Sequence, residues 1–448
     1  MIDADTALAR CQDLLHAARR KGADAADAVA RASLSEGIGV RLGALEDVER
    51  SESEELHLRV FVRQRSASIS SSDFSQAGID ALAERAVEMA RLAPEDSHAG
   101  LAPAEALFAG PMPDLDLEDG HEPSPEALRE AALLAEDAAR AVTGVTNSNG
   151  ASAGYSRSVA ALATSTGFAR SYAAAAHSLS ASCIAGEGSG MQTDYAYHTV
   201  RHHRDLPRPE AVGREAADRT VARLDPAAMP SGKVPVVFDP RVGNSLVGNL
   251  LAAMSGKAAA SKATFLLGHE DEQLFDTAIR ILDDPLRPRG LRSRPFDGEG
   301  VACLPRALVE GGRIFGWMTN VASAAQLGLP LTGHAARGGG GAPGIGASNV
   351  HMAPGDLSAE ALMADIADGL YVSGMFGQGA NLVTGDYSKG VHGFRIRDGR
   401  LAEPVAEITI AGHLLEMFRA LTPANDLEFR HAVNVPTLRI DGMTVAGA

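Results

Sequence analysis

Clustered histidines come nearest to a metal site in this sequence, because zinc in proteins is held by imidazoles that converge on one point. His198, His202 and His203 lie together in the segment YHTVRHH. On a helix, His198 and His202 would share a face, four residues apart. The segment follows a strand-like run, however, and no Glu follows His198. We therefore interpret the three as a solvated cluster.

A second histidine pattern opens like the helix of a zinc protease. His269 is followed directly by Glu270, as in the H-E-x-x-H motif. Gln273 and Leu274 occupy the positions where a second His would fall. The sequence therefore predicts an exposed polar loop here, between the apolar segments TFLLG and LFDTAIRI.

Three other histidines lie in glycine-rich loops of the second half of the chain. They are His334, His351 and His392, with Asp386 close to the last of them in sequence. They would meet only if the fold brought their loops together. Such a meeting would form a non-standard metal site, which stays open as an alternative.

Other catalytic signatures are weak. The segment SGKA at 255–258 ends like a P-loop, but Leu251 stands where that loop needs Gly and Ala258 where it needs Ser or Thr. The cysteines are Cys11, Cys183 and Cys303. Their wide spacing matches neither a zinc knuckle nor a redox pair, so we expect reduced, mostly buried thiols.

The composition argues against nucleic acid and membrane partners. The formal net charge is -16, and aromatic residues make up 4% of the chain, with Trp317 the single tryptophan. A phosphate backbone requires Lys and Arg, and base stacking requires aromatic rings. No signal peptide opens the sequence, and no apolar run approaches the ~20 residues that span a bilayer. We expect a soluble, cytoplasmic protein whose charge serves solubility.

Apolar periodicity gives the elements that would position any site. The predicted helices of the first half lie at 3–21, 75–92, 125–141 and 207–224. Alternating runs at 27–72 and 142–201 predict antiparallel strands, the first as a meander. A connection rich in Pro, Gly and acidic residues covers 93–125, and 225–233 has the composition of a linker.

The second half is richer in glycine and poorer in helices, which we expect near 242–254 and 358–367. A hairpin is predicted at 397–399. The fold class is α+β, with an N-terminal α/β half of helices and an antiparallel strand meander and a mostly antiparallel β C-terminal domain with few helices. We expect an N-terminal domain at 1–115, a middle segment at 116–227 that completes the N-terminal half, and a β-rich C-terminal domain at 228–448.

Glycine-rich polar segments in the C-terminal half allow close backbone approach or positive φ. Two interpretations stay open: they are turns of a β domain, or they line a cleft that binds an extended peptide through its main chain. The candidate cleft positions are Thr332, Gly333, Arg337, Asn349, Asn381, Thr384, Gly385, Asp386 and Ser388.

The same segments carry a family resemblance. They include LDDPLRPRGLRSRPFDGEG, TGHAARGGGGAPGIGASNVHMAPGDLS, NLVTGDYSKGVHGFRIRDGRLAEPVAEITIAGHLLEMF and the terminal VPTLRIDGMTVAGA. Over nearly its whole length the chain resembles the TldD/PmbA family, and within it the PmbA branch, also called TldE.

The resemblance implies a cytosolic protease made of two homologous chains. The TldD-type chain carries an H-E-x-x-x-H helix that binds zinc together with a downstream Cys, and the zinc-bound water attacks a peptide carbonyl with the Glu as general base. The implied substrates are unfolded or extended peptides, including precursors of modified peptides and labile antitoxins. Some members carry the older label of gyrase modulator.

The corresponding helix in this chain follows VPVVFDPRV and contains GNSLVGNLLAAMSG. Aligned with the family, Gly248 and Asn249 fall where His and Glu would stand, Ala253 falls where the second His would stand, and the tail has no Cys. None of these side chains can act as an imidazole or carboxylate ligand of zinc. The resemblance therefore implies no catalytic residue and no metal in this chain, with zinc expected in a TldD-type partner.

Three functions stay open. The first is a non-catalytic subunit of a two-chain zinc protease, paired with a TldD-type chain as a heterodimer or with a copy of itself as a homodimer. The second is a regulatory or peptide-binding protein that acts without proteolysis. The third is a self-sufficient homodimeric hydrolase with a non-standard metal site formed by His334, His351 and His392 with Asp386.

Overall fold

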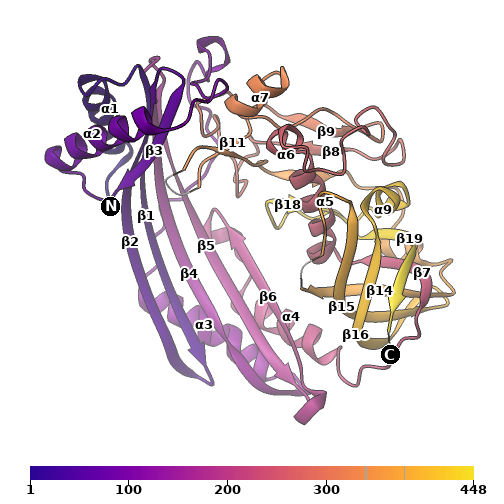
Figure 1. The fold of residues 1–448 in the computed structure, drawn as a ribbon. Helices are drawn as coiled ribbons and strands as arrows, with labels where there is room; N and C mark the ends of the chain where they lie inside the picture. The colour runs from indigo at the N-terminus through magenta and orange to yellow at the C-terminus, as the bar shows by residue number, and fades with distance from the viewer. Residues whose placement is uncertain (339–340, 378, 448) are drawn as a thin grey trace.

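A long antiparallel sheet forms the first half of the chain (Figure 1). The computed structural model describes residues 1–338, 341–377 and 379–447. The strand order is β3-β2-β1-β4-β5-β6. The strands are β1 (Ala25–Arg41), β2 (Ala44–Val62), β3 (Arg65–Ser71), β4 (Val145–Thr164), β5 (Ala169–Ala185) and β6 (Gln192–Val200). The predicted ranges 1–115 and 116–227 thus contribute strands to one sheet.

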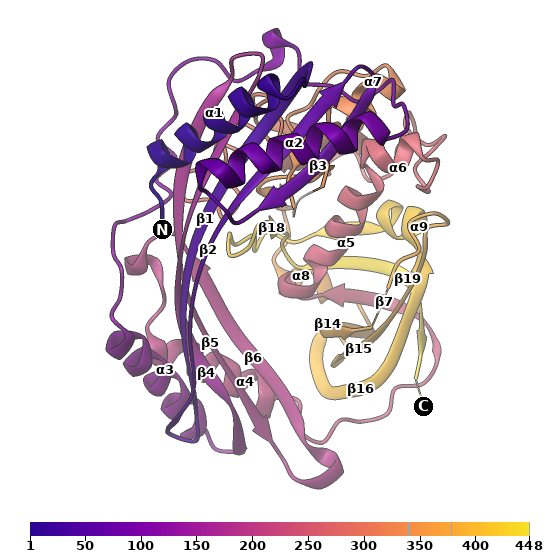
Figure 2. The same cartoon turned by 60° about the vertical axis from the view of Figure 1, so that its left-hand side comes forward.

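Helices cover one face of this sheet (Figure 2). They are α1 (Ala4–Arg20), α2 (Gln76–Leu92), α3 (Pro125–Arg140) and α4 (Pro209–Val221). Alternate residues of β1 face them: Ala28 packs beneath α1 and α2, and Ile38 packs beneath α3. The intervening residues of β1 lie on the opposite face, where Ser33 and Ser35 are exposed and Asp27 and Val29 are buried by the C-terminal half.

A closed ring of strands forms the core of the second half. The order is β16-β15-β14-β7-β19-β17, and a further pairing of β16 with β19 closes the ring. The strands are β7 (Gly232–Phe238), β14 (Asp368–Phe376), β15 (Asp386–Arg397), β16 (Arg400–His413), β17 (Leu421–Pro423) and β19 (Leu438–Ala446). The predicted hairpin is confirmed, since Arg397 pairs with Arg400 around a turn at Asp398 and Gly399.

A second, smaller sheet lies beside this ring, in the order β10-β9-β8-β13-β18. Its strands are β8 (Ile281–Asp283), β9 (Arg306–Glu310), β10 (Arg313–Ile314), β13 (Val350–Met352) and β18 (Val433–Asn434), and a short separate ladder joins β11 (Ala335–Ala336) to β12 (Gly344–Ile345). The helices of this half are α5 (Pro240–Ala253), α6 (Gly256–Ala260), α7 (Val321–Leu327), α8 (Ala359–Met363) and α9 (Leu414–Arg419).

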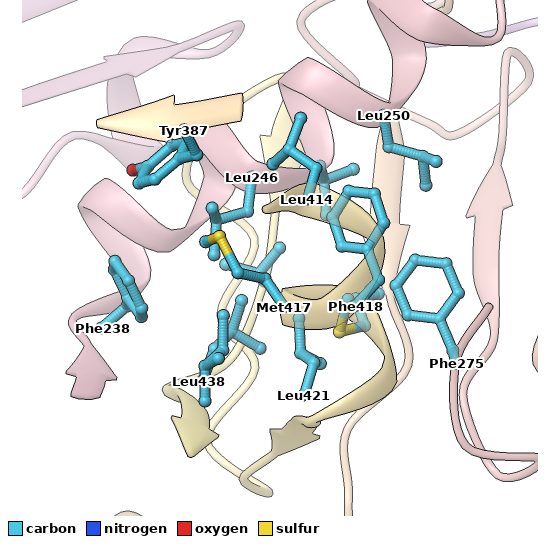
Figure 3. Packing of buried hydrophobic residues seen from close by; sticks show 14 of the residues in the cluster. Phe238, Leu246, Leu250, Phe275, Tyr387, Leu414, Met417, Phe418, Leu421 and Leu438 are labelled. Carbon is cyan, nitrogen blue, oxygen red and sulfur yellow. The ribbon is translucent and has the colours of Figure 1, made fainter. Parts of the chain in front are cut away.

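The main hydrophobic core of the second half joins the ring to α5 and α9 (Figure 3). Leu246 and Leu250 enter it from α5, while Leu414, Met417 and Phe418 enter it from α9. The rings of Phe275 and Phe418 stack with centroids 4.8 Å apart. This packing fixes the position of α5, the helix on which the family resemblance focuses.

The predicted α+β fold class is confirmed. The first half combines helices with an antiparallel strand meander, and the second half consists mostly of antiparallel strands with short helices. The helix predicted near 358–367 is shorter than expected, because α8 ends at Met363 and β14 begins at Asp368. No helix within the described ranges is long and apolar enough to cross a bilayer.

Candidate functional site

Helix α5 begins where β7 ends, and a local cap fixes this junction. The Asp239 carboxylate accepts a hydrogen bond from the backbone N of Arg241 at 2.9 Å, and Pro240 occupies the first turn. Both features favour a helix start. Leu246 and Leu250 then turn one face of the helix into the core, each with no exposed surface.

The three positions that the resemblance aligns with zinc-site residues differ in their surroundings. Gly248 borders open space, since a Cβ placed on it would meet no atom within 4 Å. Ala253 has no exposed surface, and its carbonyl accepts a hydrogen bond from Thr264 Oγ1 at 2.8 Å. At 3.6 residues per turn, positions 248 and 253 lie roughly 140° apart around the helix. Neither Gly248 and Ala253 nor the half-buried Asn249 offers an imidazole or a carboxylate on α5.

The segment that follows α5 contacts the neighbours of both groups of predicted cleft residues, the first group at 332–349 and the second at 381–388. On one side Gly256 N donates to Met318 O at 2.7 Å, and the next residue, Thr319, donates from its backbone N to Thr332 Oγ1 at 2.7 Å. On the other side Phe265 N donates to Leu382 O at 2.8 Å, next to Asn381. The fold therefore brings both groups close to the segment that follows α5.

The first group is held inside the protein. Gly333 has φ +72°, and a Cβ there would lie 2.7 Å from Ala302 O, so only glycine fits. Asn349 is 4% exposed, and its Oδ1 accepts from Arg292 N at 2.9 Å. The Asn349 amide also donates to Ser293 Oγ at 2.8 Å. Gly333 and Asn349 hold loops together and are not open to a ligand.

Arg337 also belongs to the first group, and it forms part of a buried ionic network. Its Nη2 lies 2.6 Å from Asp27 Oδ1, and Arg59 Nη2 lies 2.5 Å from Asp27 Oδ2. Arg59 also pairs with Glu299 at 3.1 Å. Asp27 and Arg59 come from β1 and β2, whereas Glu299 and Arg337 come from the C-terminal half. The network therefore joins the two halves of the chain.

The second group lies at an exposed turn before β15. Thr384 Oγ1 donates to Asp386 Oδ2 at 2.7 Å, and His413 Nε2 lies 2.8 Å from Thr384 O. Gly385 is buried with φ +86°. The exposed members are Asn381, Thr384, Asp386 and Ser388. Their side chains are accessible to a ligand.

A buried polar cluster lies beside the first group and was missed in the sequence. His334 Nε2 lies 3.0 Å from Asp283 Oδ2, and Ser348 Oγ donates to the other oxygen of the same carboxylate. Burial raises the pKa of Asp283, but hydrogen bonds from His334 and Ser348 outweigh this and lower it. A hydrolytic triad needs His between Ser and Asp. Here Asp lies between the other two, so the cluster serves structure.

A surface pocket at the free edge of the first sheet was also missed. It has a volume of about 270 Å³ and joins β6 and α4 to the start of α5. Tyr195 and Tyr197 stack with centroids 6.0 Å apart and are 50% and 44% exposed. Arg241 lies over the Tyr195 ring at 5.6 Å and pairs with Asp194 at 2.8 Å. The signal that could have found it is the spacing of the two tyrosines in DYAYH, because residues two apart in a strand share one face.

The histidine interpretations have mixed outcomes. The loop predicted around His269 is confirmed, but His269 and Glu270 are half-buried in it, with His269 Nδ1 3.0 Å from Glu272. The solvated interpretation is wrong for His202, which is 6% exposed and lies 3.0 Å from Asp116. Spacing alone does not show that a distant loop supplies a carboxylate to cover an imidazole.

The three loop histidines have separate partners. His334 belongs to the buried cluster with Asp283, and His351 packs on Phe429 with ring centroids 5.2 Å apart. His392 lies in β15 of the closed ring, where burial lowers its pKa to about 4. Among residues 1–338, 341–377 and 379–447, no three His, Cys, Asp or Glu side chains are grouped so that they would hold a metal ion.

A serine in β4 has the local sequence of a hydrolase nucleophile, G-x-S-x-G at 150–154. That motif acts at a sharp turn between a strand and a helix. Ser152 instead lies inside β4, and its Oγ is 2.8 Å from Ser180 Oγ on β5. The resemblance to a nucleophile elbow is therefore only local.

Comparison with protein families covers most of the chain. Residues 231–447 match the PmbA/TldA metallopeptidase C-terminal domain, residues 118–224 match the central domain, and residues 26–90 match domain 1. These ranges include β1, α5 and all the predicted cleft positions.

Curated relatives and solved structures agree with this match. The chain is 36% identical to Metalloprotease PmbA of Escherichia coli O157:H7, over 92% of this chain and 89% of that protein. It is 35% identical to the Metalloprotease PmbA homolog of Haemophilus influenzae, over 96% and 94% of the two chains.

Two crystal structures share the fold. A proposed modulator of DNA gyrase from Bacteroides thetaiotaomicron is 26% identical, with a TM-score of 0.91 and 100% of both chains covered. TldE from Thermococcus kodakarensis is 21% identical, with a TM-score of 0.86 over 98% of this chain and 100% of that one. On its sequence and its fold, the chain belongs to the PmbA/TldD metallopeptidase family.

Proposed function

We propose that this chain is the non-catalytic, PmbA/TldE-type subunit of a cytoplasmic two-chain zinc metalloprotease. A TldD-type chain with an H-E-x-x-x-H helix supplies the zinc and the general base. The complex processes or degrades unfolded or extended peptides, including precursors of modified peptides and labile antitoxins. The chain described here forms part of the cleft and binds no metal of its own.

One observation carries the proposal. The helix that corresponds to the family's zinc helix is fully formed as α5, yet Gly248, Asn249 and Ala253 stand at the positions of its metal ligands and base. The helix has been retained as a packing element, with its apolar face in the core of the C-terminal half. This arrangement supports a partner that supplies the chemistry, because function resides in the site residues and not in the fold.

Exposed features around α5 support a role in holding a peptide. Strand β6 is an edge of the first sheet, where an extended main chain can be added, although Arg223 and Arg219 already donate to the carbonyls of Thr193 and Tyr195. Tyr195 and Tyr197 stand on this strand with large exposed rings, which are enriched at sites of protein and peptide recognition. The exposed turn with Asn381 and Asp386 lies at the other end of α5.

The test uses untagged chain, alone and mixed with a TldD-type partner. We expect the chain alone to contain no stoichiometric zinc and to leave an unstructured peptide intact, and we expect cleavage after the partner is added. Replacing both tyrosines, Tyr195→Ala with Tyr197→Ala, should raise KM in the mixture. Leu92→Ala, which removes an 85% exposed side chain at the end of α2, serves as the control. Chelator-sensitive cleavage by the chain alone would overturn the proposal.

A regulatory role without proteolysis is the second candidate. It is favoured by the structural relative from Bacteroides thetaiotaomicron, which is described as a proposed modulator of DNA gyrase. It predicts tight binding of the chain to such a target, with full effect in cells that lack every TldD-type chain. Loss of the effect in those cells would exclude it.

A further inference from the structure

A small cavity lies where the open face of the first sheet meets loops of the C-terminal half. Its volume is about 140 Å³. The residues that matter for its chemistry are Arg31, Ala160, Tyr172, Arg294 and Arg337. It is separate from α5 and from the pocket beside β6.

The strand register explains why the cavity is open. Arg31 on β1 pairs with Ala160 on β4, and Ala160 pairs with Tyr172 on β5. The three residues therefore form one row on the same face of the sheet, with a small side chain between two long ones. The space above Ala160 is bordered by the guanidinium of Arg31 and the phenol of Tyr172, with Arg294 opposite.

The arginines around Tyr172 bond to backbone carbonyls. Arg31 donates to Arg337 O at 2.7 Å, and Arg294 donates to Gly346 O at 2.7 Å. Arg201 donates to Ala175 O at 2.8 Å, as well as to two carbonyls of the C-terminal half. Within the described ranges, none of the three is within 4.0 Å of a carboxylate. The Arg294 Nε is buried, and the described residues provide no hydrogen-bond partner for it.

Of the nearby carboxylates, Asp27 and Asp297 are bonded to other groups and Glu55 lies at the rim. Asp27 is held by Arg59 and Arg337. Glu55, opposite Arg31 on β2, lies 3.0 Å from His57 Nε2, and its charge acts on Arg31 from the rim, more than 4.0 Å away. Asp297 accepts hydrogen bonds from the backbone N atoms of Glu299, Val301 and Ala335, and burial raises its pKa to about 6.

The positive charges act on one another and on the phenol. Burial lowers the pKa of both Arg31 and Arg201. Burial also raises the pKa of Tyr172, while the charges of Arg294, Arg31 and Arg201 oppose that rise. A guanidinium withdrawn from water without a counter-ion is costly, so an anion that entered the cavity would be bound favourably.

We propose that this cavity binds the C-terminal carboxylate of an extended peptide. This inference rests on the proposed function, since it supposes that peptides enter the space between the two halves. A carboxylate matches the planar donor fork of arginine, and the cavity is large enough for one terminal residue but not for a longer ligand.

The surface next to the cavity fits the rest of such a peptide. Ser33 lies two residues beyond Arg31 on the same face and pairs with Ser158 on β4. Both side chains are exposed, and Ser33 Oγ lies 2.7 Å from Ser53 Oγ on β2. Small hydroxyl side chains let a main chain approach the sheet and give it donors and acceptors.

The test measures binding of one unstructured, fluorescein-labelled peptide to the full chain by polarisation, with the peptide either as free acid or as C-terminal amide. We expect the acid to bind about 10–100-fold more tightly, since charge-assisted hydrogen bonds are lost in the amide. R31Q and R294Q should make the two forms equal. R294K should retain part of the difference, and R129Q, at an exposed arginine on the outer helix α3, should retain all of it.

Each other outcome is decisive. Equal affinity of acid and amide for the unchanged chain overturns the carboxylate site and leaves the peptide-binding function standing. Failure of both peptides to bind overturns both. If acid and amide bind equally while inorganic phosphate binds the unchanged chain but not R294Q by calorimetry, the cavity takes a free anion, and the assignment to a peptide end is wrong.

Discussion

Asp27→Asn should destabilise the chain by about 3–5 kcal/mol, because it removes the carboxylate that compensates two buried guanidinia. Asp27 is 1% exposed, and the side chains of Arg59 and Arg337 are 7% and 6% exposed. The Asn side chain keeps the shape and loses the charge. Glu299 remains beside Arg59, but burial raises its pKa, so it compensates the network poorly.

The magnitude follows from burial, and an exposed pair provides the control. Asp13 pairs with Arg10 on α1 at 3.1 Å, with exposures of 39% and 38%. Water and salt screen such a pair, so Asp13→Asn should cost at most about 1 kcal/mol. The two substitutions are chemically identical, and only the surroundings differ.

Urea unfolding followed by far-UV circular dichroism and by Trp317 fluorescence measures the effect. Trp317 lies in the C-terminal half, so a shift in its transition shows that the network stabilises both halves. A double-mutant cycle with Arg337→Gln should give a coupling of several kcal/mol, since the two residues are in direct contact. Equal unfolding midpoints for Asp27→Asn and Asp13→Asn would refute the reasoning.

The same network gives a pH dependence. Burial raises the pKa of Asp27, but the charges of Arg337 and Arg59 outweigh it and lower the pKa below its usual 3.8. A lowered folded-state pKa means that the stabilisation is complete above the unfolded value and is lost as the pH falls through the folded value. Asp27→Asn should therefore remove this part of the acid-induced loss of stability.

Three further predictions follow from single contacts. Burial raises the pKa of Asp297 to about 6, so the folded state favours the protonated carboxyl and the free energy of unfolding falls as the pH rises from about 4 to above 6. In thermal melts, Asp297→Asn should flatten this dependence of Tm on pH. Gly213→Ala puts a Cβ 1.9 Å from Ala135 O, so it should lower the free energy of unfolding by about 1–3 kcal/mol and lower Tm. Gly248→Ala meets no atom and should be neutral or stabilise by up to about 1 kcal/mol. Leu250→Ala empties a fully buried position and should cost about 2–5 kcal/mol in urea unfolding; a cost below 1 would contradict the packing in Figure 3.

Local patterns predicted most of the elements. Asp3 caps α1, Ser75 caps α2 and Ser124 caps α3, each by accepting a hydrogen bond from a backbone N of the first turn. These residues act on their own helices, so spacing along the chain was sufficient to find the starts. The alternation in the second half of β1 likewise reflects which face is covered, a property that repeats every second residue, whereas β2 is buried on both faces at 56–61.

Long-range partners account for what the sequence did not predict. Arg337 stands in a glycine-rich segment, which indicated exposure, but Asp27 lies 310 positions earlier in the numbering and covers it. Asn349 was a polar cleft candidate for the same reason, and Ser293 and Arg292 bury it. The spacing of polar residues within a loop shows that they are polar, but it does not show whether the fold supplies their partners.

Under the proposed function, the polar contacts between the halves bear directly on how this chain influences catalysis by its partner. Arg241 in the first turn of α5 pairs with Asp194 on β6 and donates to Ser373 O at 2.7 Å. Its guanidinium thus joins the edge of the first sheet, the closed ring and α5. Directional, charge-assisted bonds hold orientation more strictly than apolar contact does. We infer that a peptide bound along the sheet is positioned relative to α5 chiefly through Arg241. Arg241→Lys keeps the charge but loses the planar donor fork, so it should raise KM in the two-chain assay. The free energy of unfolding should stay within about 1 kcal/mol of that of the unchanged chain. A large loss of stability with no change in KM would show that Arg241 only holds the halves together.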